Sequence, residues 1–295
     1  MKQRHDQTSR VLLEQESVIS VSAVITTCGR PELLRKAVRS ILEQTYEGDI
    51  EVVVVFDKIP VDELRDVEVP HGRRLTTIAN TRTPGLAGGR NTGILAADGE
   101  VIGFCDDDDD WHPQKLAQQM AVWEAAPQAV AIASGIDIRT DGTNIVRIPP
   151  EQVTFDNFLR SRVTAIHPST MLYRREDLIG RIGLVDEQLP AGYGEDYDLL
   201  IRATRFGDIY STPEPWWAFS GTGHRSLPAV GRTSLLVCRI SWPSFQSLNG
   251  ARREQPGLPG KWRLRKPRWG TGNWHASGHV AHCAEIGCSC APTLL

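Results

Sequence analysis

Five consecutive aspartates, Asp106–Asp110, are the residues of this sequence best suited to chemistry. The apolar run Val101–Cys105 leads into them, and Trp111 follows them. Adjacent carboxylates repel one another, so we expect a positive partner, and oxygen ligands of this kind suit Mg²⁺ or Mn²⁺. A solvated acidic loop is the ordinary alternative. The apolar residues before the run and the aromatic residue after it favour a cation site.

A second group of acids, Glu195, Asp196 and Asp198, begins a segment whose apolar residues have helical spacing up to Ala203. Acids in the first turn of a helix complement its dipole, and this explanation requires no activity. A cation site elsewhere in the chain favours a second explanation. A cation that neutralises a leaving group and a carboxylate that accepts a proton together suffice for group transfer.

Strand-like and helix-like segments alternate up to about residue 220. β-Branched runs predict buried strands, and apolar residues three and four positions apart predict helices. The expected strands are 18–26, 51–56, 74–79 and 101–105, and the expected helices are 31–42, 88–97 and 116–123. This order predicts an α/β domain with a largely parallel sheet. Ligands bind beyond the carboxyl ends of such strands, so we expect residues 28–30, Asp57 and the five aspartates to converge on one crevice.

Five motifs occur in an order that resembles the family-2 inverting glycosyltransferases of the GT-A fold. The motifs are Val24–Pro31, Val55–Asp57, Gly88–Gly93, Phe104–Trp111 and Gly194–Asp198. The resemblance covers about residues 18–220 and implies a Rossmann-like, mostly parallel sheet flanked by helices. It also implies Mn²⁺ or Mg²⁺ as cofactor and a nucleoside-diphosphate sugar as donor. The implied acceptor is a glycan, a lipid-linked molecule or a small molecule.

The resemblance also implies roles for individual residues. It places Asp108 on the metal and makes Asp196 the general base, with Glu195 beside it as a second catalytic residue. The residues implied to bind the nucleotide are Thr26, Cys28, Arg30, Asp57, Arg90, Asp106 and Asp107. Asp57 occupies the position that accepts a hydrogen bond from the base, which suits uracil or thymine and favours a UDP-sugar. Phe56 stands where the family often has an acid, and the choice of metal ligands among the five aspartates stays open.

Other functions fit these motifs less well. The glycine-rich segment 85–93 lacks the spacing of a dinucleotide site, and no P-loop motif occurs. A glycosidase needs two carboxylates but no nucleotide-binding motifs. A strand followed by Asp-x-Asp also resembles phosphoaspartyl phosphatases, but Asp110 and Trp111 replace the expected Thr or Val. A non-catalytic sugar-nucleotide or glycan-binding module on the same fold stays as the alternative. We expect His167 in a loop before a strand at 171–173, with an acceptor-side role as the second option.

Charge divides the 295 residues into two parts. From Arg225 onward there are ten Lys/Arg and two Asp/Glu, whereas the preceding part has 23 basic and 34 acidic residues. This break predicts a boundary near residue 222. With the GT-A domain that the resemblance implies, we expect a polar segment 1–17, a GT-A domain 18–222 and a basic, irregular tail 223–295. The histidines and cysteines of the tail do not match standard zinc spacings. Its segment 261–269 suits contact with anionic lipids, but a change of reading frame near residue 230 explains the composition best.

No segment of the sequence has the length and hydrophobicity of a signal peptide or a membrane span. We therefore expect a cytoplasmic protein, with peripheral contact at the inner face of the membrane as an option and with no nucleic-acid partner. Cys28 and Cys105 adjoin apolar runs, so we expect both to be small buried residues in a reducing compartment.

Overall fold

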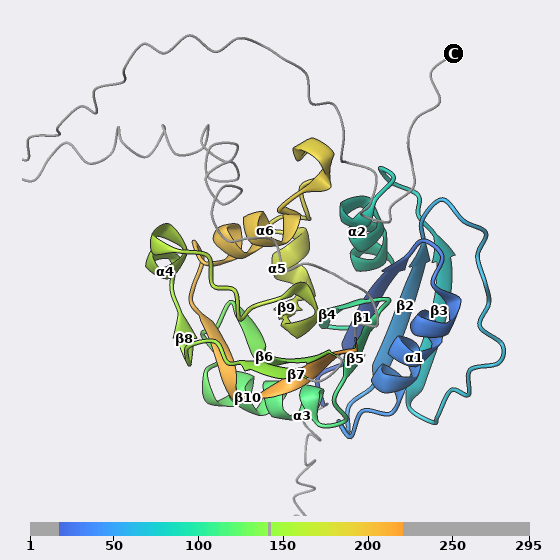
Figure 1. Ribbon diagram of the computed structural model, residues 1–295, viewed down its shortest axis with the longest axis horizontal. Coiled ribbons are helices and arrows are strands. Elements are labelled where there is room, and N and C mark those ends of the chain that lie inside the picture. The colour runs from blue at the N-terminus through green and yellow to red at the C-terminus, as the bar shows by residue number, and fades with distance from the viewer. Residues whose placement is uncertain (1–17, 141–142, 221–295) are drawn as a thin grey trace, which may run out of the picture. The chain divides into compact units, whose positions relative to one another are not determined.

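Figure 1 shows the computed structural model of the chain, which describes residues 18–140 and 143–220. The predicted segment 1–17 and the predicted tail 223–295 lie outside the described residues, so these two domain boundaries stay predictions. In the described ranges, ten strands form one sheet. None of the helices in these ranges is long and apolar enough to span a membrane.

Four parallel strands form the N-terminal half of the sheet, in the order β3-β2-β1-β4. They are β1 (Val21–Thr27), β2 (Ile50–Phe56), β3 (Arg73–Ala79) and β4 (Val101–Asp106). Every residue of β2 is buried, as expected for a β-branched run that is covered on both faces. The four strands predicted for this part of the chain are confirmed.

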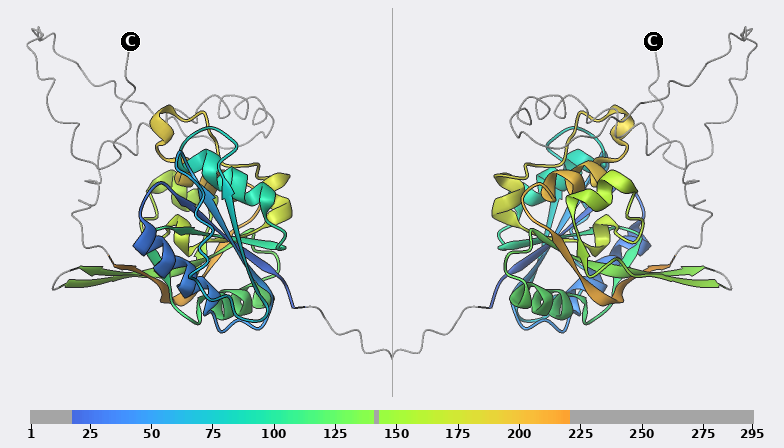
Figure 2. Two further views of the ribbon diagram at one scale, coloured as in Figure 1. Left: turned by 90° about the vertical axis from the view of Figure 1, so that its right-hand side faces the viewer. Right: turned by 90° about the vertical axis from the view of Figure 1, so that its left-hand side faces the viewer.

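Helices cover both faces of these four strands (Figure 2). The helices are α1 (Pro31–Leu42) on one face and α2 (Leu86–Ala96) on the other. Side chains alternate along a strand, so Val54 of β2 packs in the same cluster as α1, whereas Val53 packs in the cluster that contains Ile94 of α2. α1 begins with Pro31, at a position where the missing N–H leaves no hydrogen bond unmade.

Two glycines allow α2 to approach β1 closely. A Cβ atom at Gly89 would lie 2.3 Å from Cγ2 of Thr26, and one at Gly93 would lie 2.2 Å from Cγ1 of Val24. A larger residue would therefore push the helix away from the strand. Helix–strand packing accounts for these two glycines of the glycine-rich segment.

The C-terminal half of the sheet is mixed. Its strands are β5 (Asp109–Trp111), β6 (Ala131–Thr140), β7 (Thr143–Arg147), β8 (Gln152–Val153), β9 (Leu172–Arg174) and β10 (Ile209–Ser220). β9 is antiparallel to both β4 and β6, and β10 is parallel to β6. The predicted parallel arrangement therefore holds for β1 to β4 and for the pair of β6 and β10, and the other pairs of this half are antiparallel. β6 and β7 are antiparallel to each other.

The remaining helices are short and surround the C-terminal half. They are α3 (Lys115–Ala125), α4 (Phe155–Arg160), η1 (Pro168–Thr170), α5 (Arg175–Ile179), η2 (Pro190–Gly192) and α6 (Glu195–Ala203). Both α3 and α6 fall where the apolar spacing predicts a helix. η1 and α6 bring residues from the later part of the sequence to the carboxyl ends of β1 and β4, and hydrogen bonds and ion pairs join them there.

Candidate active site

The carboxyl ends of β1, β2 and β4 meet at one edge of the sheet. Oγ1 of Thr27, the last residue of β1, donates a hydrogen bond to Asp107 at 2.7 Å. The backbone N–H of Asp57, which follows β2, donates to the carbonyl of Thr27 at 2.8 Å. The predicted convergence of the strand ends is therefore present in the structure.

Three of the five aspartates form ion pairs with two cations in or just before α1. Arg30, just before α1, binds Asp107 and Asp108 through its two terminal nitrogens. Lys36 of α1 binds Asp110 at 2.7 Å. Burial raises the pKa of Asp107, although the hydrogen bond from Thr27 and the charge of Arg30 act in the opposite direction. These pairs explain how the fold tolerates so many adjacent carboxylates.

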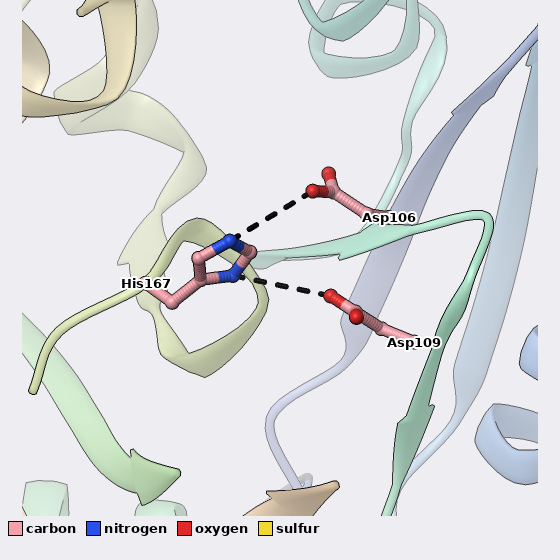
Figure 3. Close-up of side chains that lie close together, drawn as sticks. All are labelled: Asp106, Asp109 and His167. Carbon is pink, nitrogen blue, oxygen red and sulfur yellow. Dashed lines mark ion pairs between the residues drawn. The ribbon is translucent and has the colours of Figure 1, made fainter. Parts of the chain in front are cut away.

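The other two aspartates lie beside His167, as Figure 3 shows. Nε2 of the imidazole is 4.0 Å from Asp106, and Nδ1 is 3.9 Å from Asp109. One ligand atom from each of the three residues lies within 4.8 Å of the others, close enough to hold one metal ion. From the sequence, His167 was expected in a loop, and no local pattern connects it with the aspartates. The structure places it in this cluster, about sixty residues downstream of them.

Ser169 of η1 fixes the geometry of this cluster. Its hydroxyl donates to Asp109 and accepts from the backbone N–H of Asp106 at 3.0 Å. Its own backbone N–H donates to Nδ1 of His167 at 3.3 Å. The Ser169 side chain is fully buried, so it serves as a structural support of the site. No pattern in the sequence distinguishes this serine from the others.

Asp57, which follows β2, is held by hydrogen bonds to both of its carboxylate oxygens. Its two carboxylate oxygens accept from the side-chain amide of Asn80 at 2.8 Å and from the backbone N–H of Gly85 at 3.0 Å. Only 6% of the residue is exposed. Asn80 and Gly85 were not predicted as site residues. They lie in the loop after β3, and they contact Asp57 because β3 is next to β2 in the sheet.

Thr26 and Cys28, two of the residues predicted to bind the nucleotide, differ in exposure. Oγ1 of Thr26 is buried and has no hydrogen-bond partner in the described part of the chain. Cys28 is exposed, so its predicted burial is wrong, and the reason is that it lies in the loop after β1. Cys105 is buried as expected, and burial raises the pKa of its thiol well above the ordinary value.

Arg90 of α2 connects the aspartate run to the second group of acids. Its guanidinium is buried and forms two ion pairs at 3.0 Å, one with Asp106 and one with Glu195. It also lies 5.4 Å from the centre of the Phe104 ring. Burial raises the pKa of Glu195, and the charge of Arg90 counteracts this shift in part. Arg90 thus holds acids from two distant segments next to each other.

Asp196 has a different environment from Glu195. Its Oδ2 accepts a hydrogen bond from Arg162 at 3.2 Å, and its side chain is 19% exposed. Within residues 18–140 and 143–220, its Oδ1 has no hydrogen-bond partner. Glu195, in contrast, is 9% exposed and is paired with the buried Arg90. Of the two acids, Asp196 is therefore the more accessible to a bound molecule.

A comparison with protein families matches residues 22–180 to glycosyl transferase family 2. The amylovoran biosynthesis glycosyltransferase AmsB of Erwinia amylovora is 30% identical over 203 residues, which cover 64% of this chain and 65% of AmsB. The putative colanic acid biosynthesis glycosyl transferase WcaA of Escherichia coli K12 is 26% identical over 203 residues, which cover 66% of this chain and 68% of WcaA.

Crystal structures of TarS from S. aureus have a similar fold. The complex of TarS with UDP superposes with a TM-score of 0.53 at 20% identity, over 68% of this chain and 60% of the TarS chain. The complex with UDP-GlcNAc gives 0.54 at 19% identity, over 75% of this chain and 65% of the TarS chain. The match thus spans less than two thirds of AmsB and of both TarS chains.

The α/β sheet, with acids gathered at the ends of its parallel strands, has the GT-A fold that the TarS structures share. The family match covers more than half of the sequence. The chain therefore belongs to glycosyl transferase family 2, and the predicted family is confirmed.

Proposed function

We propose that this protein is a metal-dependent, inverting glycosyltransferase in which Asp196 is the general base. The observation that carries the proposal is the contrast between the two neighbouring acids. Glu195 is 9% exposed and is paired with Arg90, which is 4% exposed, whereas Asp196 is 19% exposed and is paired with Arg162, which is 35% exposed. A positioned carboxylate of this kind typically contributes about 10²–10⁴-fold to the rate of proton transfer steps.

The proposed reaction is a single displacement at the anomeric carbon of the donor sugar. Oδ1 of Asp196 takes the proton of the acceptor hydroxyl while the hydroxyl oxygen forms a bond to that carbon. The bond between the carbon and the diphosphate oxygen breaks, and its electron pair leaves with the nucleoside diphosphate. Because attack and departure occur on opposite faces, one displacement inverts the anomeric centre and requires no carboxylate nucleophile.

The donor in this proposal is a UDP-sugar. TarS, which shares the fold, binds UDP and UDP-GlcNAc. The carboxylate of Asp57 and the loop at Gly85 lie at the strand ends, where nucleotides bind in sheets of this kind. AmsB and WcaA are named for amylovoran and colanic acid biosynthesis, and we propose a glycan or lipid-linked acceptor for this chain by analogy.

A divalent cation belongs to the proposal because the cluster of Asp106, Asp109 and His167 has suitable donor atoms. It offers two carboxylate oxygens and one imidazole nitrogen, and the nitrogen favours Mn²⁺ over Mg²⁺, which prefers oxygen ligands. Asp108, the ligand implied by the family resemblance, is paired with Arg30. A cation bound at this cluster would stabilise negative charge on the departing diphosphate.

Turnover tests the base assignment directly. Release of UDP is measured with Mn²⁺ from UDP-glucose, UDP-galactose and UDP-N-acetylglucosamine, with water or short glycans as acceptors. We expect Asp196→Asn to lower kcat by about 10²–10⁴-fold while UDP affinity is retained. A larger loss of kcat in Glu195→Gln with intact folding would reverse the two roles. Parental kcat in both variants would refute the proposed mechanism.

Calorimetric titration with Mn²⁺ and UDP tests the metal ligands without relying on turnover. Asp109→Asn and His167→Ala should each weaken Mn²⁺-dependent UDP binding. Asp98→Asn is the matched control, because Asp98 is 73% exposed and pairs with Arg74 on the surface. If Asp108→Asn weakens binding and Asp109→Asn does not, the ligand implied by the family resemblance is the correct one.

A further inference from the structure

Arg162 is a charged residue next to Asp196, the proposed general base, and it belongs to none of the five sequence motifs. It lies in the segment between α4 and η1, about thirty residues before Asp196. Its Nη2 donates to Oδ2 of Asp196 at 3.2 Å, and its side chain is 35% exposed. The contact leaves Oδ1 of the same carboxylate without a partner among the described residues. Arg162 therefore holds Oδ2, the carboxylate oxygen of Asp196 that takes no proton in the proposed mechanism.

Arg162 is itself held by an aromatic residue of α6. The guanidinium carbon lies 5.5 Å from the centre of the Tyr197 ring. The Tyr197 hydroxyl donates to the carbonyl of Phe158 at 3.1 Å, and the two rings pack edge to face at 5.6 Å. A planar guanidinium stacked on a fixed ring loses little further freedom when it forms a hydrogen bond. The arginine can thus hold a short side chain in one orientation.

We propose that Arg162 is a positioning residue for the general base. By holding Oδ2 of Asp196, it directs Oδ1 toward the acceptor hydroxyl. The inference rests on the proposed function, because it assigns Arg162 to the base named there. Misplacing a reacting group by about 1 Å costs up to about 10²-fold in rate, so orientation alone is sufficient for a measurable role.

An ion pair with this exposure contributes little to folding. Pairs between solvent-exposed charges have a small effect on stability, because water screens them and because two side chains must be ordered. The contact between Arg162 and Asp196 is therefore not required to hold α6 in place. The buried contact between Tyr197 and Phe158 serves that purpose. This difference allows a role in orientation to be separated from a role in folding.

The first experiment compares Arg162→Met with Arg160→Met in the UDP-release assay. Arg160 is an exposed arginine at the end of α4 and serves as the matched control. We expect Arg162→Met to lower kcat by about 10–100-fold with the KM for the UDP-sugar unchanged. Its melting temperature should stay within about 3 °C of the parent. Arg162→Lys should recover part of the loss, and Arg160→Met should behave like the parent.

The second experiment is a double-mutant cycle with Asp196→Asn. If Arg162 acts only through the carboxylate, Arg162→Met should cause no further loss of kcat in the Asp196→Asn background. Equal losses in both backgrounds would mean that Arg162 contacts the substrates directly, and this would overturn the inference. Parental kcat in Arg162→Met, with Asp196→Asn slow, would refute the inference alone. Parental kcat in Asp196→Asn would refute the base assignment and the inference together.

Discussion

Substitution of Glu187 by Gln tests whether one carboxylate joins two parts of the site. The side chain is 13% exposed and accepts hydrogen bonds from Asn91 Nδ2 at 2.7 Å, from the backbone N–H of Thr83 at 3.2 Å and from Arg82. Asn91 belongs to α2, and Arg82 and Thr83 belong to the loop after β3. The next residues of that loop include Gly85, whose N–H contacts the site.

The size of the effect follows from the ionisation of Glu187. Burial would raise its pKa, but the hydrogen bonds from Asn91, Arg82 and Thr83 outweigh burial and lower the pKa from 4.5 to about 2. A shift of that size corresponds to about 3 kcal/mol in favour of the ionised form in the folded chain. Arg82 is 39% exposed, so water screens part of this energy. We therefore expect Glu187→Gln to lower the free energy of unfolding by about 1–2 kcal/mol at neutral pH.

The effect should depend on pH in one direction. A carboxylate with a lowered pKa stabilises the fold fully above its unfolded-state pKa, here 4.5. The stabilisation is then lost as pH falls from 4.5 toward the folded-state value of about 2. The difference in stability between the parent and Glu187→Gln should thus be constant above about pH 5 and should shrink below it.

Urea unfolding, followed by tryptophan fluorescence at several pH values, measures this difference. Glu63→Gln is the control, because Glu63 is 63% exposed and pairs only with Arg65, two residues away. A loss of about 1–2 kcal/mol should lower the melting temperature by roughly 2–8 °C in a domain of this size. Equal stability of Glu187→Gln and the control, or a difference that does not change with pH, would refute the reasoning.

Two further predictions concern buried packing. Lys115 is fully buried, with Nζ 3.8 Å from the centre of the Trp111 ring, and burial lowers its pKa to about 7. Between about pH 7 and 10.5, Lys115 is therefore protonated in the unfolded chain and neutral in the folded chain. Lys115→Met should raise the free energy of unfolding by about 1–3 kcal/mol below pH 7, and urea titrations should show this gain disappear as pH rises toward 10.5. Gly89→Ala should cost about 1–3 kcal/mol, because its Cβ meets Cγ2 of Thr26. Thr26→Ser removes that atom and should restore part of the loss, and a lack of any rescue would contradict this explanation.

Local patterns were sufficient to predict the N-terminal half of the fold. The strands there are rich in β-branched and apolar residues, most clearly in β2, and α1 has a regular apolar face, so local residues determine each element. β10 was not predicted, because Pro213 and Pro215 interrupt the pattern and proline is rare within paired strands. The structure accommodates them with irregular pairing between Ser211 and Trp217. The short strand β5 was missed because two of its three residues are acidic.

The partners of the predicted acids could not be read from the sequence. Asp106 and Asp109 meet His167 and Ser169 only because β9 returns antiparallel to β4 and places η1 beside the strand end. Arg162 reaches the second group of acids through a segment without regular structure. Such contacts join residues far apart in the chain, so they depend on the tertiary fold and not on local spacing.

The division of labour between Glu195 and Asp196 depends on the geometry of one helical turn. Successive residues of an α-helix point in directions about 100° apart, so two adjacent acids at the start of α6 cannot face the same way. Glu195 points to the buried Arg90, and Asp196 points to the half-exposed Arg162. Local spacing alone does not distinguish these two similar carboxylates, and only the family resemblance favoured Asp196. The helix turns Glu195 toward the buried Arg90 of the aspartate run and leaves Asp196 the more exposed of the two.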